Sequence, residues 1–386
     1  MHTLPRTRRA ALAAGAGLLT LWLAAAAPAQ AATDLVIGQV APITGVIAGT
    51  GNEYVAGAAA YFAQVNAKGG INGRRIRVVL RDDAYKPAAT VEHTKEILAK
   101  ENPIALFGFI GTANVAALQK NKVLSDAKIA LLAPYTGAQE LRDPMDPHLF
   151  HIRASYGDET ASMVEHLHTI GLRRFAVFHQ NDGFGKNGLD GAVSALKKLG
   201  LEPAAVGHYE RTKPNEVDEA VSRIVAAKPD AVIMVSVNRA SAAFIKKLRA
   251  AGSRARLFSI SVVNFKELLK NAGEDMARGV GIAQVMPYPY TPSSPVAREF
   301  LAAMKQHQPE ATISYASIEG FIAAKVLVEA IRRTGAEPTR ERVLAALETL
   351  RDFDVGGFRT TFSRDDHVGS GFVDVTVIGR DGRLLR

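Results

Sequence analysis

The chain contains no cysteine among its 386 residues. This absence excludes disulfide bonds, thiol nucleophiles and thiolate metal sites. Hydrophobic cores must therefore hold the fold, and the composition supplies them: 47% of the residues are hydrophobic and 22% are charged, as in ordinary globular proteins. A chain of this length exceeds what one core usually supports, which indicates two compact domains.

After residue 31 the chain lacks any run of the roughly 18–20 apolar residues that cross a membrane. The apolar, alanine-rich stretch 10–27 follows three arginines within residues 6–9 and ends in an A-x-A pattern, which is typical of a secretory signal peptide over residues 1–31. A retained membrane anchor is the alternative, and the weak hydrophobicity of alanine argues against it. We therefore expect an exported, periplasmic protein that begins near Ala32.

The export route stays open between two machineries. The Arg8-Arg9 pair resembles a twin-arginine signal, although Ala11 stands where a phenylalanine is common. Arginine pairs are also frequent at the basic start of ordinary signal peptides. The sequence is thus compatible with the general secretory (Sec) route and with the twin-arginine route.

The chain also lacks a concentrated charge of one sign. Removal of the signal peptide takes away three arginines and no acid, so the formal charge falls from +9 to +6. The remaining basic pairs, such as Lys197-Lys198, lie on the outer faces of predicted helices, where they are solvated. No nucleic-acid-binding motif accompanies them, so we predict no nucleic-acid partner.

Motifs of catalysis or of nucleotide binding are missing or incomplete. There is no G-x-S-x-G nucleophile elbow. Residues 183–187 faintly resemble a P-loop, but Gln180 stands where a glycine is needed and Asn187 replaces the serine or threonine. Residues 49–51 begin like a dinucleotide fingerprint, but Tyr54 occupies the third glycine position. We predict that the chain is not an enzyme and needs no cofactor.

Titratable side chains show no metal-binding or catalytic spacing. His166 and His168 alternate along a predicted helix, so they point to different faces and cannot chelate one ion together. Asp82 and Asp83 follow a predicted strand; paired carboxylates are one interpretation, and a strand end that enters a loop is the simpler one. We predict no catalytic residue and no metal site.

What the chain does contain is a repeated alternation of apolar strands and amphipathic helices. Strands are predicted at 35–41, 76–80, 104–110, 129–133, 175–179, 231–237, 257–263 and 280–285, with short ones near 358–362 and 372–378. Helices are predicted at 51–68, 87–100, 112–126, 158–170, 184–199, 215–227, 239–251, 295–306, 315–333 and 340–350. Two such sets predict an α/β fold with two lobes, each a mostly parallel sheet flanked by helices.

Polar and flexible loops follow several of the predicted strands. Open α/β sheets bind their ligands at the carboxyl ends of strands, beside helix N-termini that carry free N–H groups. The loops in question are 42–45, 111–114, 134–138, 181–185 and 237–239. The sequence therefore predicts a binding cleft for a small molecule at these loops.

These loops, in this order, resemble the type I periplasmic solute-binding proteins of the leucine/isoleucine/valine-binding family. The resemblance covers essentially the whole chain after the signal peptide. It rests on the opening 37–45, the stretch 65–74, the turn Asp182-Gly183-Phe184-Gly185 and the strand entry 228–232. Any one of these motifs is weak, and together they are specific.

The resemblance implies a fold in which three crossings between the lobes form a hinge. Lobe one would take 32–151 plus 286–368, and lobe two 152–285 plus 369–386. It also implies a monomer that binds a small-molecule ligand and delivers it to the membrane permease of an ABC importer. The alternative is a ligand-sensing module of the same fold that serves a receptor or regulator.

The same resemblance implies the residues of the ligand site. The hydroxyl that holds a ligand carboxylate falls on Thr112, and an aromatic wall from lobe two falls on Phe184. A plain helix N-cap is the alternative for Thr112, and core packing is the alternative for Phe184. The full set of implied ligand-binding residues is Thr112, Ala113, Tyr135, Thr136, Gly137, Phe184 and Asn238.

The chain departs from the family at one point. Members that bind amino acids commonly present an acidic residue of lobe two to the ligand ammonium group, but residues 262–264 are Val-Val-Asn and no acid precedes Glu267. A buried ammonium group without an anionic partner is costly. The sequence therefore leaves branched-chain amino acids open as ligands and favours aromatic or aliphatic acids, whose flat or apolar bodies Tyr135 and Phe184 would suit.

Overall fold

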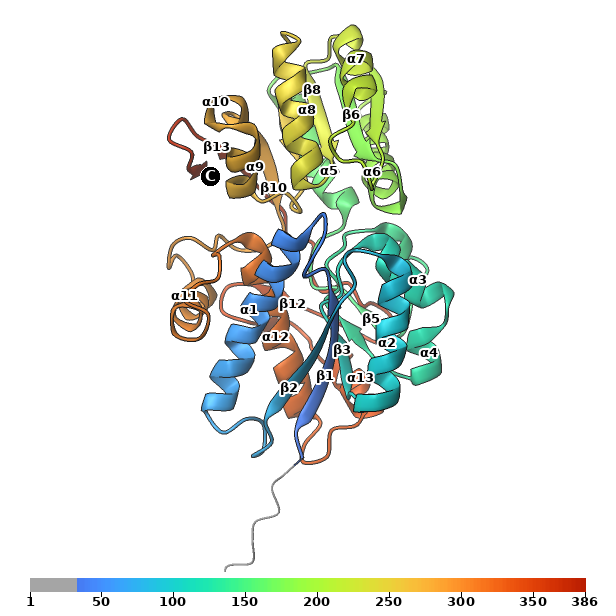
Figure 1. The fold of residues 1–386 in the computed structure, drawn as a ribbon, viewed down its shortest axis with the longest axis vertical. Coiled ribbons are helices and arrows are strands. Elements are labelled where there is room, and N and C mark those ends of the chain that lie inside the picture. The colour runs from blue at the N-terminus through green and yellow to red at the C-terminus, as the bar shows by residue number, and fades with distance from the viewer. Residues whose placement is uncertain (1–32) are drawn as a thin grey trace, which may run out of the picture. The chain divides into compact units, whose positions relative to one another are not determined.

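The computed structural model describes residues 33–386, and the predicted signal peptide lies outside the described residues. Two large sheets form the centres of two lobes (Figure 1). The sheet of lobe one has the order β2-β1-β3-β4-β5, and all of its strands run parallel. Its strands are β1 (Leu35–Ala41), β2 (Ile76–Asp82), β3 (Ala105–Phe107), β4 (Leu131–Leu132) and β5 (Leu149–Phe150).

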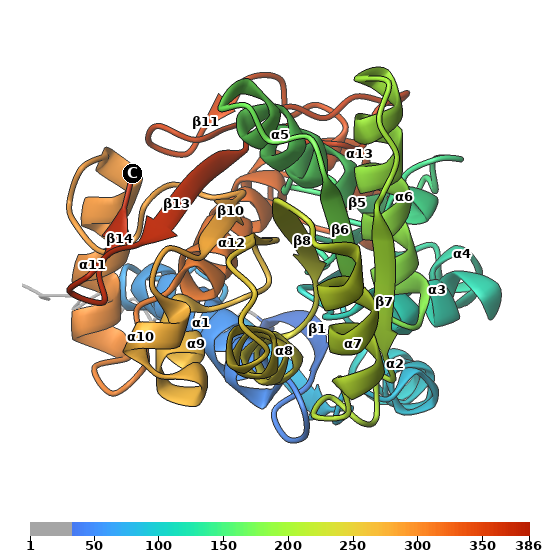
Figure 2. The ribbon, with the colours of Figure 1, turned by 90° about the horizontal axis from the view of Figure 1, so that it is seen from above.

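The sheet of lobe two has the order β14-β13-β10-β9-β8-β6-β7. Its strands are β6 (Phe175–Gln180), β7 (Ala205–Tyr209), β8 (Ala231–Val235), β9 (Arg256–Ser259), β10 (Gly281–Gln284), β13 (Asp374–Ile378) and β14 (Leu384–Leu385). Figure 2 shows β13 beside β10, to which it pairs in the antiparallel sense. The C-terminal strands β13 and β14 therefore extend an otherwise parallel sheet.

Helices cover both sheets. Lobe one carries α1 (Ala48–Ala67), α2 (Pro87–Glu101), α3 (Thr112–Lys120), α4 (Val123–Ala127), α11 (Pro295–His307), α12 (Tyr315–Arg333) and α13 (Arg340–Leu347). Lobe two carries α5 (Tyr156–Thr169), α6 (Gly183–Lys198), α7 (Asp218–Ala227), α8 (Asn238–Ala250), α9 (Phe265–Ala272) and α10 (Glu274–Ala277). A short 3-10 turn, Gln139–Leu141, and a hairpin of β11 (Phe353–Asp354) and β12 (Arg359–Thr360) complete lobe one.

The described chain passes between the two sheets three times: after β5, after β10 and before β13. The predicted α/β fold with two mostly parallel sheets is thus confirmed, and the exact residue boundaries of the lobes stay a prediction. No helix among residues 33–386 has the length and apolar character needed to span a bilayer.

Several elements differ from the sequence-based prediction. The helix predicted at 112–126 is two helices, α3 and α4, because Lys122 takes a left-handed conformation with φ of 54°. Strand β7 was not predicted because glycine and histidine interrupt its short apolar pattern. The strands predicted at 231–237 and 257–263 end earlier, so Val237 and Val262 belong to loops.

Helices α1 and α12 pack so closely that their backbones are in contact. A methyl group in place of the Gly57 α-hydrogen would lie 1.7 Å from the Ser317 carbonyl oxygen. On the partner helix, the same change at Gly320 would lie 2.1 Å from the Tyr54 carbonyl oxygen. Glycine is therefore required at this crossing for steric reasons.

Substitution of Gly57 by alanine is expected to lower the free energy of unfolding by about 1–3 kcal/mol, because the added methyl group forces the two helices apart. Gly49→Ala on the same helix is the matched control, since no atom lies within 4 Å of the added methyl group. It is expected to raise the free energy of unfolding by about 0.5–1 kcal/mol. Urea unfolding measures both, and equal effects of the two substitutions would contradict the packing argument.

Candidate binding site

A cavity lies between the two lobes, at the carboxyl ends of their strands. The empty space within it and at its mouth is about 360 Å³. Its lining comes from loops after β2, β3 and β4 of lobe one and after β6, β8 and β9 of lobe two, with the first turns of α1 and α5. The lining residues are Ile47, Thr50, Tyr85, Ile110, Gly111, Thr112, Tyr135, Tyr156, Phe184, Val237 and Val262.

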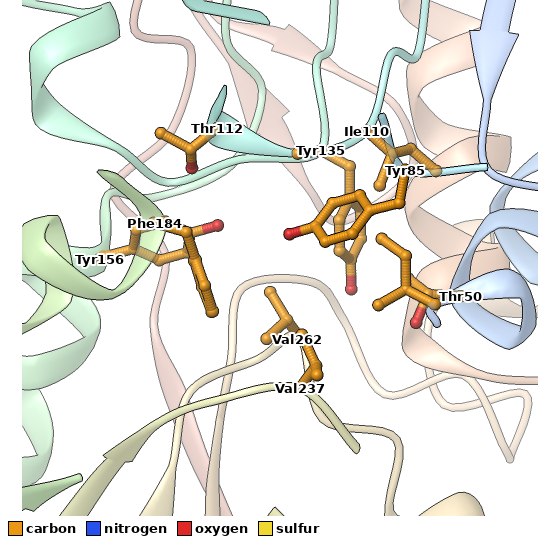
Figure 3. A pocket seen from close by; sticks show the side chains of 11 residues that line it. Thr50, Tyr85, Ile110, Thr112, Tyr135, Tyr156, Phe184, Val237 and Val262 are labelled. Carbon is orange, nitrogen blue, oxygen red and sulfur yellow. The ribbon is translucent and has the colours of Figure 1, made fainter. Parts of the chain in front are cut away.

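Apolar and hydroxyl-bearing side chains share this lining (Figure 3). Val237 and Val262 approach from lobe two, opposite Thr112 of lobe one, and the hydroxyl group of Tyr85 points into the space. None of the lining residues carries a formal charge. Among residues 33–386, no three histidine, aspartate or glutamate side chains are arranged to hold a metal ion.

Thr112 opens helix α3 at the wall of the cavity. Its side chain is 1% exposed, and its Oγ1 lies 2.7 Å from Oγ1 of Thr136. The N-cap residue of α3 is Gly111, with φ of 107°, and the cap carries no side-chain hydrogen bond. The hydroxyl of Thr112 therefore forms a hydrogen bond with Thr136 at the wall of the cavity and does not cap its own helix.

The N-terminus of α3 supplies hydrogen-bond donors to the cavity. The first backbone bond of the helix runs from the Val115 N–H to the Gly111 carbonyl, at 3.0 Å, so the preceding amides have no partner within the helix. These amides and the helix dipole place a partial positive charge at this point. The arrangement suits an anionic group of a ligand.

A second helix N-terminus, that of α6, meets the same end of the cavity. Asp182 caps α6 by accepting a hydrogen bond from the Gly185 amide at 3.3 Å. A methyl group on Gly183 would lie 3.8 Å from Cγ2 of Thr112, which shows how closely the first turns of α3 and α6 approach. The two lobes thus each contribute a helix N-terminus here.

Three tyrosines bring hydroxyl groups to the cavity. Burial raises the pKa of Tyr85 to about 12, against a lowering effect of Arg211. Burial also raises the pKa of Tyr135 and of Tyr156, against a lowering effect of Arg153 in both cases. All three hydroxyls are therefore protonated at neutral pH and can donate to a ligand.

The loop after β2 fixes the position of Tyr85. The Asp82 carboxylate accepts hydrogen bonds from the Ile43 amide at 2.9 Å and from the Thr44 hydroxyl at 2.6 Å. The Asp83 carboxylate accepts one from the Tyr85 amide at 2.9 Å. The two aspartates thus organise loops at a strand end, in line with the simpler interpretation of their sequence.

Arg211, just after β7 of lobe two, reaches across to lobe one. It donates hydrogen bonds to the Tyr85 carbonyl at 2.7 Å and to Oδ1 of Asn114 at 2.9 Å. It also pairs with Asp182 at 2.9 Å, and its guanidinium carbon lies 3.4 Å from the centre of the Tyr85 ring. Arg211 therefore joins the lobes beside the cavity.

Substitution of Arg211 by alanine is expected to weaken ligand binding about tenfold, because contacts between lobes favour the closed state that a ligand needs. Arg223→Ala, which removes an exposed arginine paired with Glu219 on α7, is the control and should leave affinity unchanged. Isothermal titration calorimetry with the tightest-binding compound from a thermal-shift screen of small molecules measures both. Equal affinities of the two variants would show that the Arg211 contacts do not support closure.

Behind Tyr135 lies a buried group of charges from both lobes. Arg153 Nη2 is 3.6 Å from Glu159 of α5, and its Nη1 is 3.6 Å from Glu319 of α12. Its guanidinium carbon is 4.4 Å from the centre of the Tyr135 ring. Ser261, after β9, donates from its amide to Glu159 at 2.6 Å and also bonds Arg153.

Arg153 lies between two carboxylates in this group, and the buried Arg142 also lowers the pKa of both. Burial raises the pKa of Glu319 to about 7, although Arg153 lowers it. Burial also raises the pKa of Glu159, again opposed by Arg153. The group therefore joins the lobes and the wall of the cavity through buried charges.

Of the seven site residues predicted from the sequence, three line the cavity, and the other four do not. Thr112, Tyr135 and Phe184 line the cavity, and Phe184 also packs edge-on against Tyr156 with ring centres 5.3 Å apart. The other four stand behind the lining or outside it.

Two of those four, Thr136 and Gly137, support the lining from behind. Thr136 bonds Thr112, and the Gly137 carbonyl accepts from the Tyr156 amide at 2.7 Å. Ala113 is half-buried in the first turn of α3. Asn238 does not line the cavity, and its Oδ1 accepts from the Asn264 amide at 2.8 Å.

Sequence reasoning missed several lining residues. Tyr85 lies in the loop between Asp83 and the start of the helix at Pro87. This loop follows a predicted strand, so its position at a strand end could have marked Tyr85 as a site residue. Tyr156 opens α5 directly after Ser155, which caps that helix with a hydrogen bond from Asp158 at 3.0 Å. For Thr50 the sequence offers no signal, since it lies among the small residues of the first turn of α1.

Comparison with known proteins identifies the family of the chain. The sequence model of a family described as periplasmic binding protein matches residues 34–383. An amino acid binding protein of Pseudomonas aeruginosa is 26% identical over 305 residues, which are 76% of this chain and 79% of that protein.

Solved structures are similar over most of their length. A substrate-binding periplasmic protein from Ralstonia solanacearum is 40% identical, with a TM-score of 0.87, and the match covers 91% of this chain and 99% of that one. A possible leucine/isoleucine/valine-binding protein from Rhodopirellula baltica is 28% identical, also with a TM-score of 0.87, over 94% of this chain and 98% of that one.

Proposed function

Because the chain belongs to the periplasmic binding protein family, we propose that it captures a small carboxylate-bearing solute outside the cytoplasmic membrane and delivers it to an ABC importer. Its relatives include Leu/Ile/Val-binding proteins, and similar solved structures include substrate-binding proteins of ABC transporters, which supports solute binding for transport. The cavity between the lobes is the binding site in this proposal, with Thr112, Tyr135 and Phe184 in its wall.

One observation carries the choice of a carboxylate. The first turn of α3 opens into a cavity whose lining has no charged side chain, and Thr112 places its hydroxyl there. A carboxylate at this point accepts from the hydroxyl and from backbone amides that have no partner in the helix. In a buried site such charge-assisted hydrogen bonds are stronger than neutral ones.

The rest of the lining favours an apolar body. Ile47, Ile110, Phe184, Val237 and Val262 surround the space, and Tyr85, Tyr135 and Tyr156 add aromatic faces. No carboxylate lines the cavity to balance an α-ammonium group, whose burial would be costly. We therefore favour aromatic or aliphatic acids over α-amino acids, although the name of the Pseudomonas aeruginosa relative points to an amino acid.

Matched series of ligands test this proposal by thermal shift and calorimetry. The series pairs aromatic and aliphatic acids with their primary amides and with α-amino acids of similar size. The acids are expected to raise the unfolding temperature, since a ligand at a hundredfold excess over its Kd adds about 2.7 kcal/mol to the free energy of unfolding. Each amide should bind at least about tenfold more weakly than its acid. Amides that bind as tightly as the acids would refute the carboxylate assignment.

A further inference from the structure

A second chamber adjoins the cavity described above, and the empty space within it and at its mouth is about 270 Å³. Thr50, Tyr135 and Val262 belong to the walls of both spaces. The remaining walls of the second chamber come from α1, from the loop between β9 and α9, from the loop after β10 and from the start of α12. They are Glu53, Ser261, Val263, Asn264, Phe265, Tyr290, Ser314, Tyr315 and Ala316.

Glu53 gives this chamber a chemical character that the first cavity lacks. Its side chain is 8% exposed, and the Asn264 amide group donates to Oε1 at 2.8 Å and to Oε2 at 2.9 Å. No lysine, arginine or histidine among residues 33–386 forms an ion pair with it. Burial raises the pKa of Glu53, and the hydrogen bonds of Ser314 and Asn264 oppose this effect.

The carboxylate retains capacity for a further donor. A carboxylate offers about four lone-pair sites; Asn264 uses one on each oxygen, and Ser314 accounts for one more. Lys266 lowers the pKa of Glu53 through its charge but forms no ion pair with it, and a buried carboxylate that has lost water is stabilised by a cation that enters its site. The Glu53 carboxylate can therefore accept a hydrogen bond from a ligand group in the chamber, and a positively charged group would be bound most strongly.

Aromatic rings line the same chamber as Glu53. The ring of Tyr290 stands edge-on to Phe265, with centres 5.4 Å apart, and edge-on to Tyr315, with centres 5.9 Å apart. Lys266 Nζ already lies 5.1 Å from the centre of the Tyr290 ring. Aromatic faces with a nearby carboxylate are the surroundings that hold ammonium groups in proteins.

We propose that the second chamber is an ammonium subsite, in which Glu53 and the surrounding tyrosines hold the distal amino group of an ω-amino acid whose carboxylate lies at Thr112. The inference rests on the proposed function, since it takes the carboxylate position from it. It adds a substrate class: acids with an amino group at the far end of an extended chain.

The layout of the two spaces explains why the amino group must be distal. Thr112 lines only the first cavity and Glu53 only the second, with Thr50, Tyr135 and Val262 between them. In an α-amino acid both charged groups sit on one carbon, so such a ligand cannot place one group in each space. A chain of several methylene groups can, and it also covers the apolar walls.

Calorimetry with two matched series tests the subsite. The probes are γ-aminobutyrate, δ-aminovalerate and ε-aminocaproate, each compared with butyrate, valerate or caproate of the same length. We expect at least one ω-amino acid to bind about tenfold or more tightly than its alkanoate. Glu53→Gln should abolish that preference while leaving alkanoate affinity nearly unchanged. Glu165→Gln, which removes an exposed carboxylate of α5, is the control and should keep the preference.

The outcomes separate the subsite from the carboxylate site. If alkanoates and ω-amino acids bind equally, or if the ω-amino acids do not bind at millimolar concentration while alkanoates do, the subsite is refuted and the carboxylate site stands. If Glu53→Gln retains the preference, the amino group lies elsewhere and the subsite is refuted as well. If the amides of the alkanoates bind as tightly as the acids, the proposed function fails instead.

Discussion

Substitution of Arg153 by methionine is expected to lower the free energy of unfolding by about 3–5 kcal/mol. The substitution keeps a long side chain but leaves Glu159 and Glu319 buried without their arginine. It also removes the cation from the face of Tyr135 and the bond to Ser261. Chemical unfolding monitored by circular dichroism measures the effect, and a loss below about 1 kcal/mol would contradict the structural role of the group.

Glu319→Gln is the matched control, because it keeps the shape and removes one of the two carboxylate charges. Its stability should be close to that of the wild type at neutral pH. The pKa of Glu319 is about 7 in the folded protein against an ordinary value of 4.5, so the folded state binds more protons between these values. This contribution to stability is fully present below about pH 4.5 and is lost as the pH rises through about 7. The Glu319→Gln variant should therefore show a shallower fall in stability over this window.

Substitution of Thr112 by valine is expected to weaken binding of an acid about tenfold to a hundredfold. Valine keeps the shape and removes the hydroxyl, so the bound carboxylate loses one charge-assisted hydrogen bond of about 1.5–3 kcal/mol. Calorimetry with the best acid from the screen measures the change.

Thr94→Val is the control for that experiment. Thr94 is equally buried in lobe one, where its hydroxyl donates to the Thr90 carbonyl of the same helix at 2.6 Å, and it does not line the cavity. This variant loses a hydrogen bond of the fold and should bind the acid like the wild type. Unchanged affinity in Thr112→Val would mean that the carboxylate is held elsewhere.

The loops of the site could be predicted from the sequence because strand ends carry local signals. The glycine and the hydroxyl at 111–112 follow an apolar run, and the loop at 134–138 follows another. The apolar pattern predicts strands that are too long where the apolar residues continue past the last hydrogen bond between strands. Val237 and Val262 extend such apolar runs, yet they lie in loops that line the cavity. Only the tertiary pairing of β8 and β9 decides where each strand ends.

Residues that meet from distant parts of the chain could not be found in this way. Glu53 sits in a helix, and Asn264, its partner, follows a strand more than two hundred residues later. The sequence shows that residues 262–264 contain no acid. It does not show that Glu53, on the other lobe, lines a chamber together with Tyr135. The same holds for Arg153, whose partners Glu159 and Glu319 lie on helices of different lobes.

The most direct test of the carboxylate site is a crystal structure of the protein with the acid that stabilises it most in the thermal-shift screen. We expect the ligand between the lobes, with its carboxylate within hydrogen-bond distance of the Thr112 hydroxyl and of the first amides of α3. Its body should contact Phe184, Val237 and Val262. A ligand bound outside this cavity, or one whose carboxylate points away from α3, would contradict the account.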